Sequence, residues 1–511
     1  MRYLYGLAIL CCLVLWSSCR NDFETVASTG NLEFSKDTVY LDTIFSNIGS
    51  STYNLKVYNR SDEDINIPTV RLSQGEASNY RLNVDGVPGK VFENVQILAK
   101  DSIFVFVETT FDINNLPTND LDFLYTDQLL FDSGGNQQKV ELVTLVKDAV
   151  FLFPEKYSDG TFETLTFGTG DDAVEVKGFF LDDNELTFTN EKPYVIYGYA
   201  AVPGNKTLTL EAGARVHFHN GSAILVANNG TIKSMGLKSD DLELMENEVI
   251  FEGDRLEPGF ADVPGQWLAI WLTGGSVNNE FNYTTIKNST AGILADESNV
   301  TLKNVQIYNS TNVGLLARNS FIRGENMVIN NSGQSSLAIQ LGGDYEFKHC
   351  TFANYWTGGF RSFPTVSIDN TFETVDEIQI ADLVRADFIN CIIYGNERRE
   401  FSLFKNDLGA FNFKFENSLI RFEDPTGEFG DNPLYDFTNA SLYTSIVQNQ
   451  DPVFQDTEMN NFNIESGTSG ADNIGKPRVG PSKDLNGTPR GNTEQDPPDA
   501  GAYEATEFPQ G

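Results

Sequence analysis

Carboxylates that stand side by side are the first residues of this chain whose chemistry needs an explanation. They are Asp171-Asp172, Asp182-Asp183, Asp240-Asp241, Asp296-Glu297 and Glu423-Asp424. Two carboxyl groups that flank a glycosidic bond can hydrolyse it, one as the acid and the other as the base or nucleophile. All five pairs fall in segments that we expect to be loops, not at matched positions of a repeat. Because the chain has 72 acidic residues, such pairs arise by chance, and we predict no catalytic residue.

Histidine and cysteine offer little further chemistry. His217 and His219 are spaced by two, so both side chains lie on one face of a strand. They could bind a metal ion, but no third ligand stands nearby in the sequence, and we favour a half-exposed strand. Of five cysteines, only Cys350 and Cys391 follow residue 19. We therefore predict no metal site, no cofactor and no disulfide framework.

An aromatic segment, Tyr355–Arg361, reads YWTGGFR. Aromatic rings offer apolar area with a polar rim, and a neighbouring Arg suits the binding of a sugar. Tyr355, Trp356 and Arg361 are therefore candidate glycan contacts. The alternative is a corner loop that packs on its neighbour.

A repeat must position these residues. In each of six pieces a residue that is usually Asn precedes a bulky apolar residue by three positions, and a second Asn often follows. The bulky residues recur at steps of 21, 22, 23, 41 and 27 positions, and they are Ile286, Ile307, Ile329, Phe352, Ile393 and Ile420. A period in the low twenties, with a strand in each unit, is typical of a β-solenoid. Leucine-rich repeats need several Leu in each unit, which these pieces lack.

Stacked coils of a solenoid bring identical positions into columns, about 4.8 Å apart along the axis. The bulky apolar column predicts a core. The column before it predicts a ladder of amides at a corner, because Asn tolerates turn conformations; its members are Asn304, Asn326, Asn390 and Asn417. His349 interrupts this column, and we expect it to replace Asn as a hydrogen-bonding corner residue.

The two downstream cysteines share one column of the repeat and lie 391 − 350 = 41 residues apart. If that separation were two coils, strand spacing would place them about 9.6 Å apart, beyond the reach of a disulfide. If it were one coil with an insertion, a bridge would be within reach. We expect both thiols to be reduced.

Residues 20–148 differ from the repeat, because short segments alternate apolar and polar residues between turns. Examples are Thr38–Leu41, Tyr53–Tyr58, Ile65–Leu72, Ser102–Thr109 and Lys139–Val146. This pattern predicts a β-sandwich, and its order resembles Hydin-type immunoglobulin-like modules. Residues 149–205 are expected to be a linker and an N-terminal cap, and residues 206–505 a right-handed parallel β-helix with a closing segment.

The closing segment carries a further resemblance. Asp484–Arg490 reads DLNGTPR and Asp499–Glu504 reads DAGAYE. These stretches resemble the closing motif of bacterial right-handed β-helix proteins of the pectate-lyase-like superfamily. The resemblance implies an all-β fold, in which a right-handed parallel β-helix is preceded by an immunoglobulin-like β-sandwich, and a secreted location. It does not imply one activity, because β-helices host lyases, hydrolases, adhesins and proteins without known activity.

The formal net charge of −37 restricts the partners of the chain. Nucleic acid is excluded, because binding it needs a basic excess that releases phosphate counterions. Polyanionic glycans are disfavoured unless a cation bridges them. We favour a binding or scaffold surface, plausibly for glycans, over the alternative, a carbohydrate-active enzyme that would be a polysaccharide lyase or a glycoside hydrolase.

The N-terminal residues 1–19 combine Arg2, an apolar run and Ser17-Ser18-Cys19. This run has the proportions of a signal peptide, and its end resembles a bacterial lipobox, although Trp16 stands where Leu is common. The alternative is an ordinary secretory signal. A lipidated Cys19 implies an anchor in the outer membrane of a Gram-negative bacterium, on its surface or periplasmic face.

Labelling of the protein in cells with a fatty-acid analogue tests this anchor. We expect label on the wild type and none on Cys19→Ala, because the acyl chains are attached to this residue. Cys12→Ala, which removes another cysteine that could be the acylated one, should label like the wild type. Equal labelling of wild type and Cys19→Ala would contradict the prediction.

Overall fold

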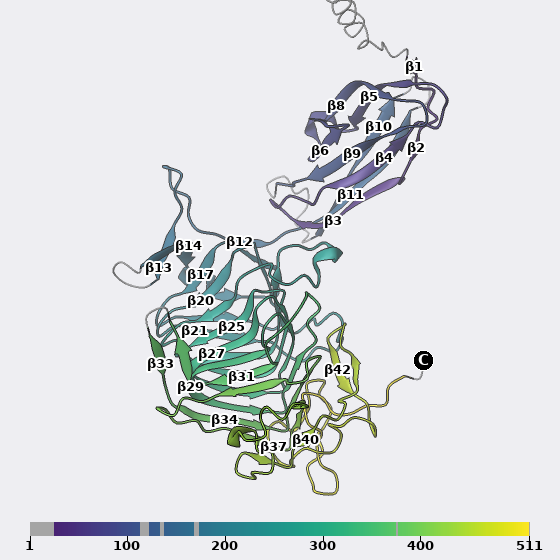
Figure 1. The fold of residues 1–511 in the computed structure, drawn as a ribbon. Helices are drawn as coiled ribbons and strands as arrows, with labels where there is room; N and C mark the ends of the chain where they lie inside the picture. Colours follow the sequence, from purple (N-terminus) through teal and green to yellow (C-terminus); the bar gives the residue numbers. More distant parts are fainter. Residues whose placement is uncertain (1–24, 113–121, 133–136, 168–172, 375–376, 510–511) are drawn as a thin grey trace, which may run out of the picture. The chain divides into compact units, whose positions relative to one another are not determined.

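The structure, a computed structural model, describes residues 25–112, 122–132, 137–167, 173–374 and 377–509. The chain divides into two compact units, Met1–Asp148 and Ala149–Gly511. In both, the regular secondary structure is almost entirely β-strand, joined by loops and turns (Figure 1). Among the described residues, no helix is long and apolar enough to cross a membrane. The predicted signal peptide and its Cys19 lie outside the described residues.

The first unit consists of two sheets. One pairs its strands in the order β1, β5, β10, β11 and β3, and its sixth strand, β8, also pairs with β5. The other pairs its strands in the order β2, β4, β9, β6 and β7. Their bounds are β1 Val26–Ala27, β2 Glu33–Phe34, β3 Thr38–Phe45, β4 Tyr53–Tyr58, β5 Ile65–Leu72, β6 Tyr80–Val84, β7 Val87–Gly89, β8 Val91–Ile97, β9 Ser102–Thr109, β10 Asp122–Asp132 and β11 Gln138–Lys147. A 3₁₀ turn, η1 (Gly75–Ala77), precedes β6.

Alternation along these strands creates the core of the first unit. In β9, Ile103, Val105 and Val107 are buried while Phe104 and Phe106 between them are exposed. Successive side chains point to opposite faces of a strand, so one face of each sheet is apolar and packs in a shared cluster. The strands expected from the sequence over residues 53–58, 65–72 and 102–109 are confirmed at those bounds.

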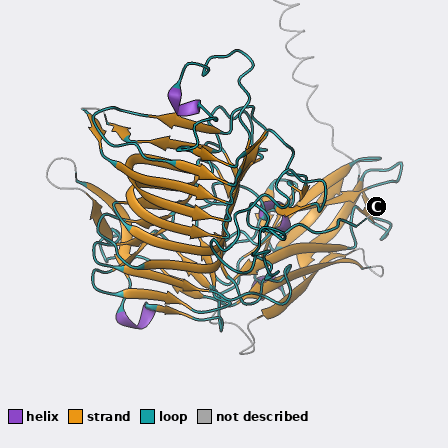
Figure 2. Cartoon of the chain, turned by 90° about the horizontal axis from the view of Figure 1, so that it is seen from below, coloured by secondary structure: helices purple, strands orange, loops and turns teal. Residues whose placement is uncertain are grey.

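The second unit contains a 27-stranded, mostly parallel sheet arranged as three ladders. Most strands pair with the strand two or three further along the chain, after the chain has passed through the other two ladders; we call this passage a circuit. Figure 2 shows the resulting stack of strands. Four long strands contribute to two ladders each, so they bend at a corner; they are β24 (Asn279–Lys287), β26 (Asn299–Ser310), β27 (Val313–Glu325) and β29 (Leu337–Lys348).

Besides parts of β24 and β26, the first ladder contains β12 (Val150–Leu152), β16 (Tyr194–Ile196), β19 (Arg215–Phe218), β22 (Val249–Gly253), β28 (Val328–Ser332), β30 (Thr351–Asn354), β35 (Ile392–Gly395), β38 (Leu419–Ile420) and β40 (Val447–Gln448). Besides parts of β27 and β29, the second contains β14 (Val174–Phe180), β17 (Tyr199–Val202), β20 (Ala223–Val226), β23 (Ile270–Leu272), β25 (Ala291–Asp296), β31 (Val366–Asp369) and β36 (Phe401–Phe404). The third ladder contains the remaining half of each of the four long strands. Its other members are β15 (Thr187–Phe188), β18 (Thr207–Leu210), β21 (Thr231–Met235), β34 (Leu383–Ile389), β37 (Lys414–Glu416) and β39 (Tyr443–Thr444).

Short elements stand outside the ladders. The antiparallel pairs involve β13 (Thr164–Phe167) on β14, β32 (Thr371–Glu373) with β33 (Ile378–Ile380), and β41 (Phe454–Asp456) with β42 (Asn461–Ile464). The other 3₁₀ turns within the described residues are η4 (Asp183–Glu185), η5 (Pro258–Phe260) and η6 (Pro433–Tyr435).

The bulky apolar column of the repeat forms the inner side of the first ladder, as expected. Register pairs Ile286 with Ile307, Ile307 with Ile329, and Ile329 with Phe352. The column continues through Ile393 to Ile420. All of these side chains are buried in one continuous cluster, so the stacking of identical positions builds the core.

Asparagines hold the corners of the circuits, which confirms the expected ladder. Asn304, Asn326 and Asn390 have positive φ values of 54°, 51° and 56°. Asn326 Nδ2 donates to Asn304 Oδ1 at 2.9 Å, and Asn390 pairs at 2.9 Å with Nε2 of His349. His349, at φ 51°, thus replaces an Asn as expected. A second row of hydrogen-bonded asparagine side chains lies at the next corner and consists of Asn331, Asn309 and Asn288.

The irregular step of 41 residues is one circuit with an insertion. The insertion includes the hairpin of β32 and β33, and β29 then pairs directly with β34. Cys350 and Cys391 therefore face each other on adjacent strands, because Thr351 pairs with Ile392. Both are buried, free thiols, and they share one column as expected.

The segment expected as linker and cap, residues 149–205, takes part in the same sheet. β12 pairs with β16, and β14 with β17, both in parallel. The ladders thus begin at Val150 and not near residue 206. This early start of the ladders was not recognisable in the sequence, because the earliest circuits lack the Asn that marks the later corners.

The C-terminal tail, from β41 onward, packs along the outer side of the first ladder. Its Phe462, Leu485 and Tyr503 contact Tyr308 and Val328. Corner asparagines attach it: Asn326, Asn390 and Asn417 donate to the carbonyls of Lys483, Lys476 and Ile474 at 2.8–3.0 Å. One set of side chains therefore both turns the chain and holds the tail.

Substitution of Asn326 tests this double role. Asn326→Ala places a Cβ-bearing residue without a local hydrogen bond at a left-handed corner and removes the amide contacts, so we expect the free energy of unfolding to fall by about 3–5 kcal/mol. Asn326→Gly relieves the backbone strain alone and should lose about 1–2 kcal/mol less. Urea denaturation measures both, with exposed Asn184→Ala as the control. Equal losses for Ala and Gly would contradict the strained corner.

Candidate functional site

One column of polar residues runs along the outer side of the third ladder. It holds the residue immediately before each of the six repeated pieces, and register pairs these residues from strand to strand: Glu280, Thr301, Arg323, Glu346, Asp387 and Lys414. The next residue of each strand points inward, as Phe347 and Phe388 do. We call this column, with the side chains that pair with it, the charged face.

Ion pairs tie the middle of the charged face together. Asp344 Oδ1 accepts from Arg323 Nη2 at 3.0 Å and from Arg385 Nε at 2.9 Å. Arg385 Nη1 also donates to Glu346 Oε2 at 3.0 Å, and Lys348 pairs with the other oxygen of Glu346. These side chains are a quarter to a third exposed at most, so the network is fixed in place and still faces solvent.

Two carboxyl groups of the charged face, Glu346 and Asp387, are neighbours on adjacent strands. Burial raises the pKa of Asp387, and the negative charge of Glu346 adds to this effect against the opposing Arg385. Burial also acts to raise the pKa of Glu346, but Lys348, Arg385 and Arg323 together outweigh it and lower that pKa. Adjacent carboxyl groups with pKa values moved apart are suited to be an acid and a base.

A groove opens on the same outer side, at the start of the charged face. It has a volume of about 920 Å³, and its lining includes Thr207, Thr231, Asn278, Asn299, Thr301 and Phe321. The ring of Phe321 is 47% exposed, and the guanidinium of Arg323 lies 3.6 Å from its centroid. Hydroxyls and amides that surround an exposed ring can bind the hydroxyls and the apolar face of a sugar.

The three aromatic-loop residues expected to contact a glycan are placed as follows. Arg361 is buried and donates to both carboxylate oxygens of the buried Glu400, at 3.0 and 2.7 Å. Tyr355 packs against Phe454 and Phe462 of the tail. Trp356 is half-buried. The geometry gives Arg361 and Tyr355 structural partners, and glycan contact by this loop stays a prediction.

His217 of β19 and His219, just after that strand, lie in a polar cluster on the first ladder. Asp254 Oδ2 lies 2.7 Å from His219 Nδ1, and Lys287 pairs with Glu252 at 2.8 Å. His217 is buried, which lowers its pKa against the opposing charge of Glu252. Within the described residues, no group of three or more His, Cys, Asp and Glu side chains is arranged to hold a metal ion.

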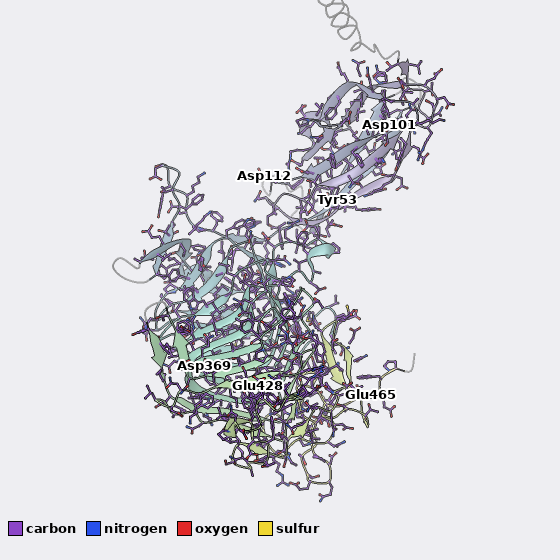
Figure 3. All side chains as sticks on the ribbon, in the orientation of Figure 1. Tyr53, Asp101, Asp112, Asp369, Glu428 and Glu465 are labelled. Carbon is purple, nitrogen blue, oxygen red and sulfur yellow. The ribbon has the colours of Figure 1, made fainter. Side chains whose placement is uncertain are left out.

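The charged face is not recognisable from neighbouring residues of the sequence, because strand pairing brings together acidic residues that are far apart along the chain. Glu346 and Asp387 are adjacent in space but 387 − 346 = 41 residues apart. The usable signal was the position before each repeated piece, which is acidic at Glu280, Glu346 and Asp387. Figure 3 draws the side chains of both units; its label for Asp369 marks β31 of the second ladder.

Comparisons with known proteins add no family. No family model matches the chain, and no curated protein matches it. A solved family 123 glycoside hydrolase from Clostridium perfringens is similar over 24% of this chain and 28% of its own, with 9% identity and a TM-score of 0.17. The periplasmic chaperone SfaE is similar over 26% of this chain and 74% of its own, with 12% identity and a TM-score of 0.16. At these scores neither likeness bears on fold or function.

Removal of the Arg361 side chain tests its structural role. Arg361→Ala leaves the carboxylate of Glu400 buried without its cation, so we expect a loss of about 3–5 kcal/mol in the free energy of unfolding. The exposed Arg398→Ala is the matched control and should change little. A stable Arg361→Ala variant in thermal and urea denaturation would show that Glu400 does not depend on this partner.

Proposed function

We propose that this protein is a lipoprotein whose second unit is a right-handed parallel β-helix with a glycan-binding face, preceded by an immunoglobulin-like β-sandwich. The three parallel ladders and their stacked corners support the β-helix. The two sheets packed on one apolar cluster support the sandwich. Anchoring through Cys19 in the outer membrane of a Gram-negative bacterium, on its surface or periplasmic face, belongs to the same proposal.

The groove beside Phe321 carries the glycan-binding part of the proposal. Its volume of about 920 Å³ exceeds that of one sugar unit and is open along the ladder's outer side. Thr, Asn and charged side chains offer both donors and acceptors to hydroxyl groups. The exposed ring of Phe321 offers the apolar surface on which the face of a sugar stacks.

The expected ligand is a neutral glycan. Charges in the middle of the charged face pair with one another across strands, as Arg323 and Arg385 do with Asp344. A polyanion would have to displace these partners against a net charge of −37. Neutral hydroxyl groups can bind beside the pairs without breaking them.

Glycoside hydrolysis is the second candidate function, and the Glu346–Asp387 pair favours it. The raised pKa of Asp387 suits a general acid, and the lowered pKa of Glu346 suits a base or nucleophile. The ion pairs of Glu346 with Lys348 and Arg385 oppose that second role, because they hold both of its oxygens. We therefore rank binding above catalysis.

A glycan array probed with the full-length protein in detergent tests the binding proposal. We expect binding to at least one neutral glycan, and Phe321→Ala should weaken it about tenfold, because stacking and apolar contact are lost. Phe404→Ala, a 58% exposed ring on β36 of the second ladder, is the matched control and should bind like the wild type.

Absence of binding to every neutral glycan, or equal effects of both Phe substitutions, would contradict the groove as the binding site. A product assay on each bound glycan separates the two candidate functions. Release of reducing ends that Asp387→Asn abolishes, while binding persists, would make the protein a hydrolase.

A further inference from the structure

A second cavity lies on a different side of the second unit, where the C-terminal tail crosses the first ladder. Its volume is about 410 Å³. The lining comes from three parts of the chain: the corner loop before β22, the outer face of β26, and the tail on both sides of β42. It shares no lining residue with the groove beside Phe321.

The buried Glu248 lines this cavity, and its side chain is the reason to expect a ligand. The residue is 6% exposed. The two hydrogen bonds to its carboxyl group, from Thr285 Oγ1 at 3.2 Å and Gln306 Nε2 at 3.4 Å, both go to Oε2. A buried carboxyl group with long contacts on one oxygen leaves Oε1 to bind whatever fills the cavity.

A chain of polar groups extends from Glu248 along the wall. Gln306 accepts from the hydroxyl of Tyr308 at 2.8 Å, and Tyr308 interacts with the phenol of Tyr503 on the tail. Burial raises the pKa of Glu248, against the opposing effects of Thr285 and Arg215. In its neutral form the carboxyl group can donate as well as accept a hydrogen bond.

Two apolar side chains at the rim of the cavity are open to solvent. Met459 is 75% exposed and Leu242 is 54% exposed, and both line the cavity. A floor that hydrogen-bonds and a rim that offers apolar contact match the two surfaces of a sugar ring, which carries hydroxyl groups at its edge and C–H groups on its faces. Charged ligands fit less well, because Lys238 and Glu243 at the edge have opposite signs.

We propose that this cavity is a binding site for a single neutral sugar residue, held by Glu248, Gln306 and Tyr503 and covered by Met459. The site is independent of the proposed groove, because it lies on another ladder and has its own lining. It requires the tail to be docked, since Tyr503 and Met459 both belong to the tail.

Titration of the full-length protein in detergent with glucose, galactose and N-acetylglucosamine tests the site, with saturation-transfer NMR as the readout. We expect saturable binding of at least one of them. Glu248→Ala should weaken it at least about tenfold, since a hydrogen bond to a buried group is lost. Glu248→Gln keeps an acceptor and a donor and should restore most of the affinity.

Met459→Trp, which fills the rim at an exposed position, should also weaken binding about tenfold, and it keeps the test valid if Glu248→Ala does not fold. Leu408→Trp, at an 85% exposed position elsewhere, is the control. Phe321→Ala should leave this binding unchanged, which separates failure of this site from failure of the groove. Absence of saturable binding by all three sugars, or equal binding by wild type and Met459→Trp, would overturn the proposal.

Discussion

The second unit depends on residues that can turn the chain left-handed while their side chains bond along the stack. Each circuit must change direction at a corner, and positive φ is costly for most residues. Asn reduces that cost, because its short amide bonds to neighbouring backbone and side chains. Asn304, Asn326 and Asn390 do so at one corner, and the interior columns can then align.

Fixed corners determine what each outer side presents. With the turn set, strand alternation sends Phe347 and Phe388 inward, so Glu346 and Asp387 must face outward on adjacent strands. Each outer column then brings together the residues that occupy the same position in successive circuits. On the third ladder this is a row of paired charges next to a groove, and on the first ladder it is a surface that the tail covers.

The sequence predicted those parts of the fold that follow local rules. The Ile286 column and the Asn corners were recognisable, because spacing and residue type determine them without knowledge of distant partners. The start of the ladders at Val150 was not, because strands as short as β12 carry no distinctive pattern.

The sites were less predictable, since they depend on distant contacts. Arg361 in an aromatic loop suggested a ligand, but its buried partner Glu400 is 39 residues away. Glu346 and Asp387 are paired on adjacent strands, but an inserted hairpin lengthens the circuit between them to 41 residues. The cavity at Glu248 exists only where the tail returns, more than 200 residues later in the sequence.

In any oxidising compartment, the two stacked cysteines must be buried by folding before their thiols are oxidised. Burial raises the pKa of Cys350 well above its usual value, and Cys391 beside it adds to the effect. Disulfide exchange needs a thiolate, so these two buried thiols of the folded core react more slowly than those of an unfolded chain, which exposes both of them and any other cysteine still present. In such a compartment, folding of the circuit from Cys350 to Cys391 therefore competes with oxidation of the exposed thiols.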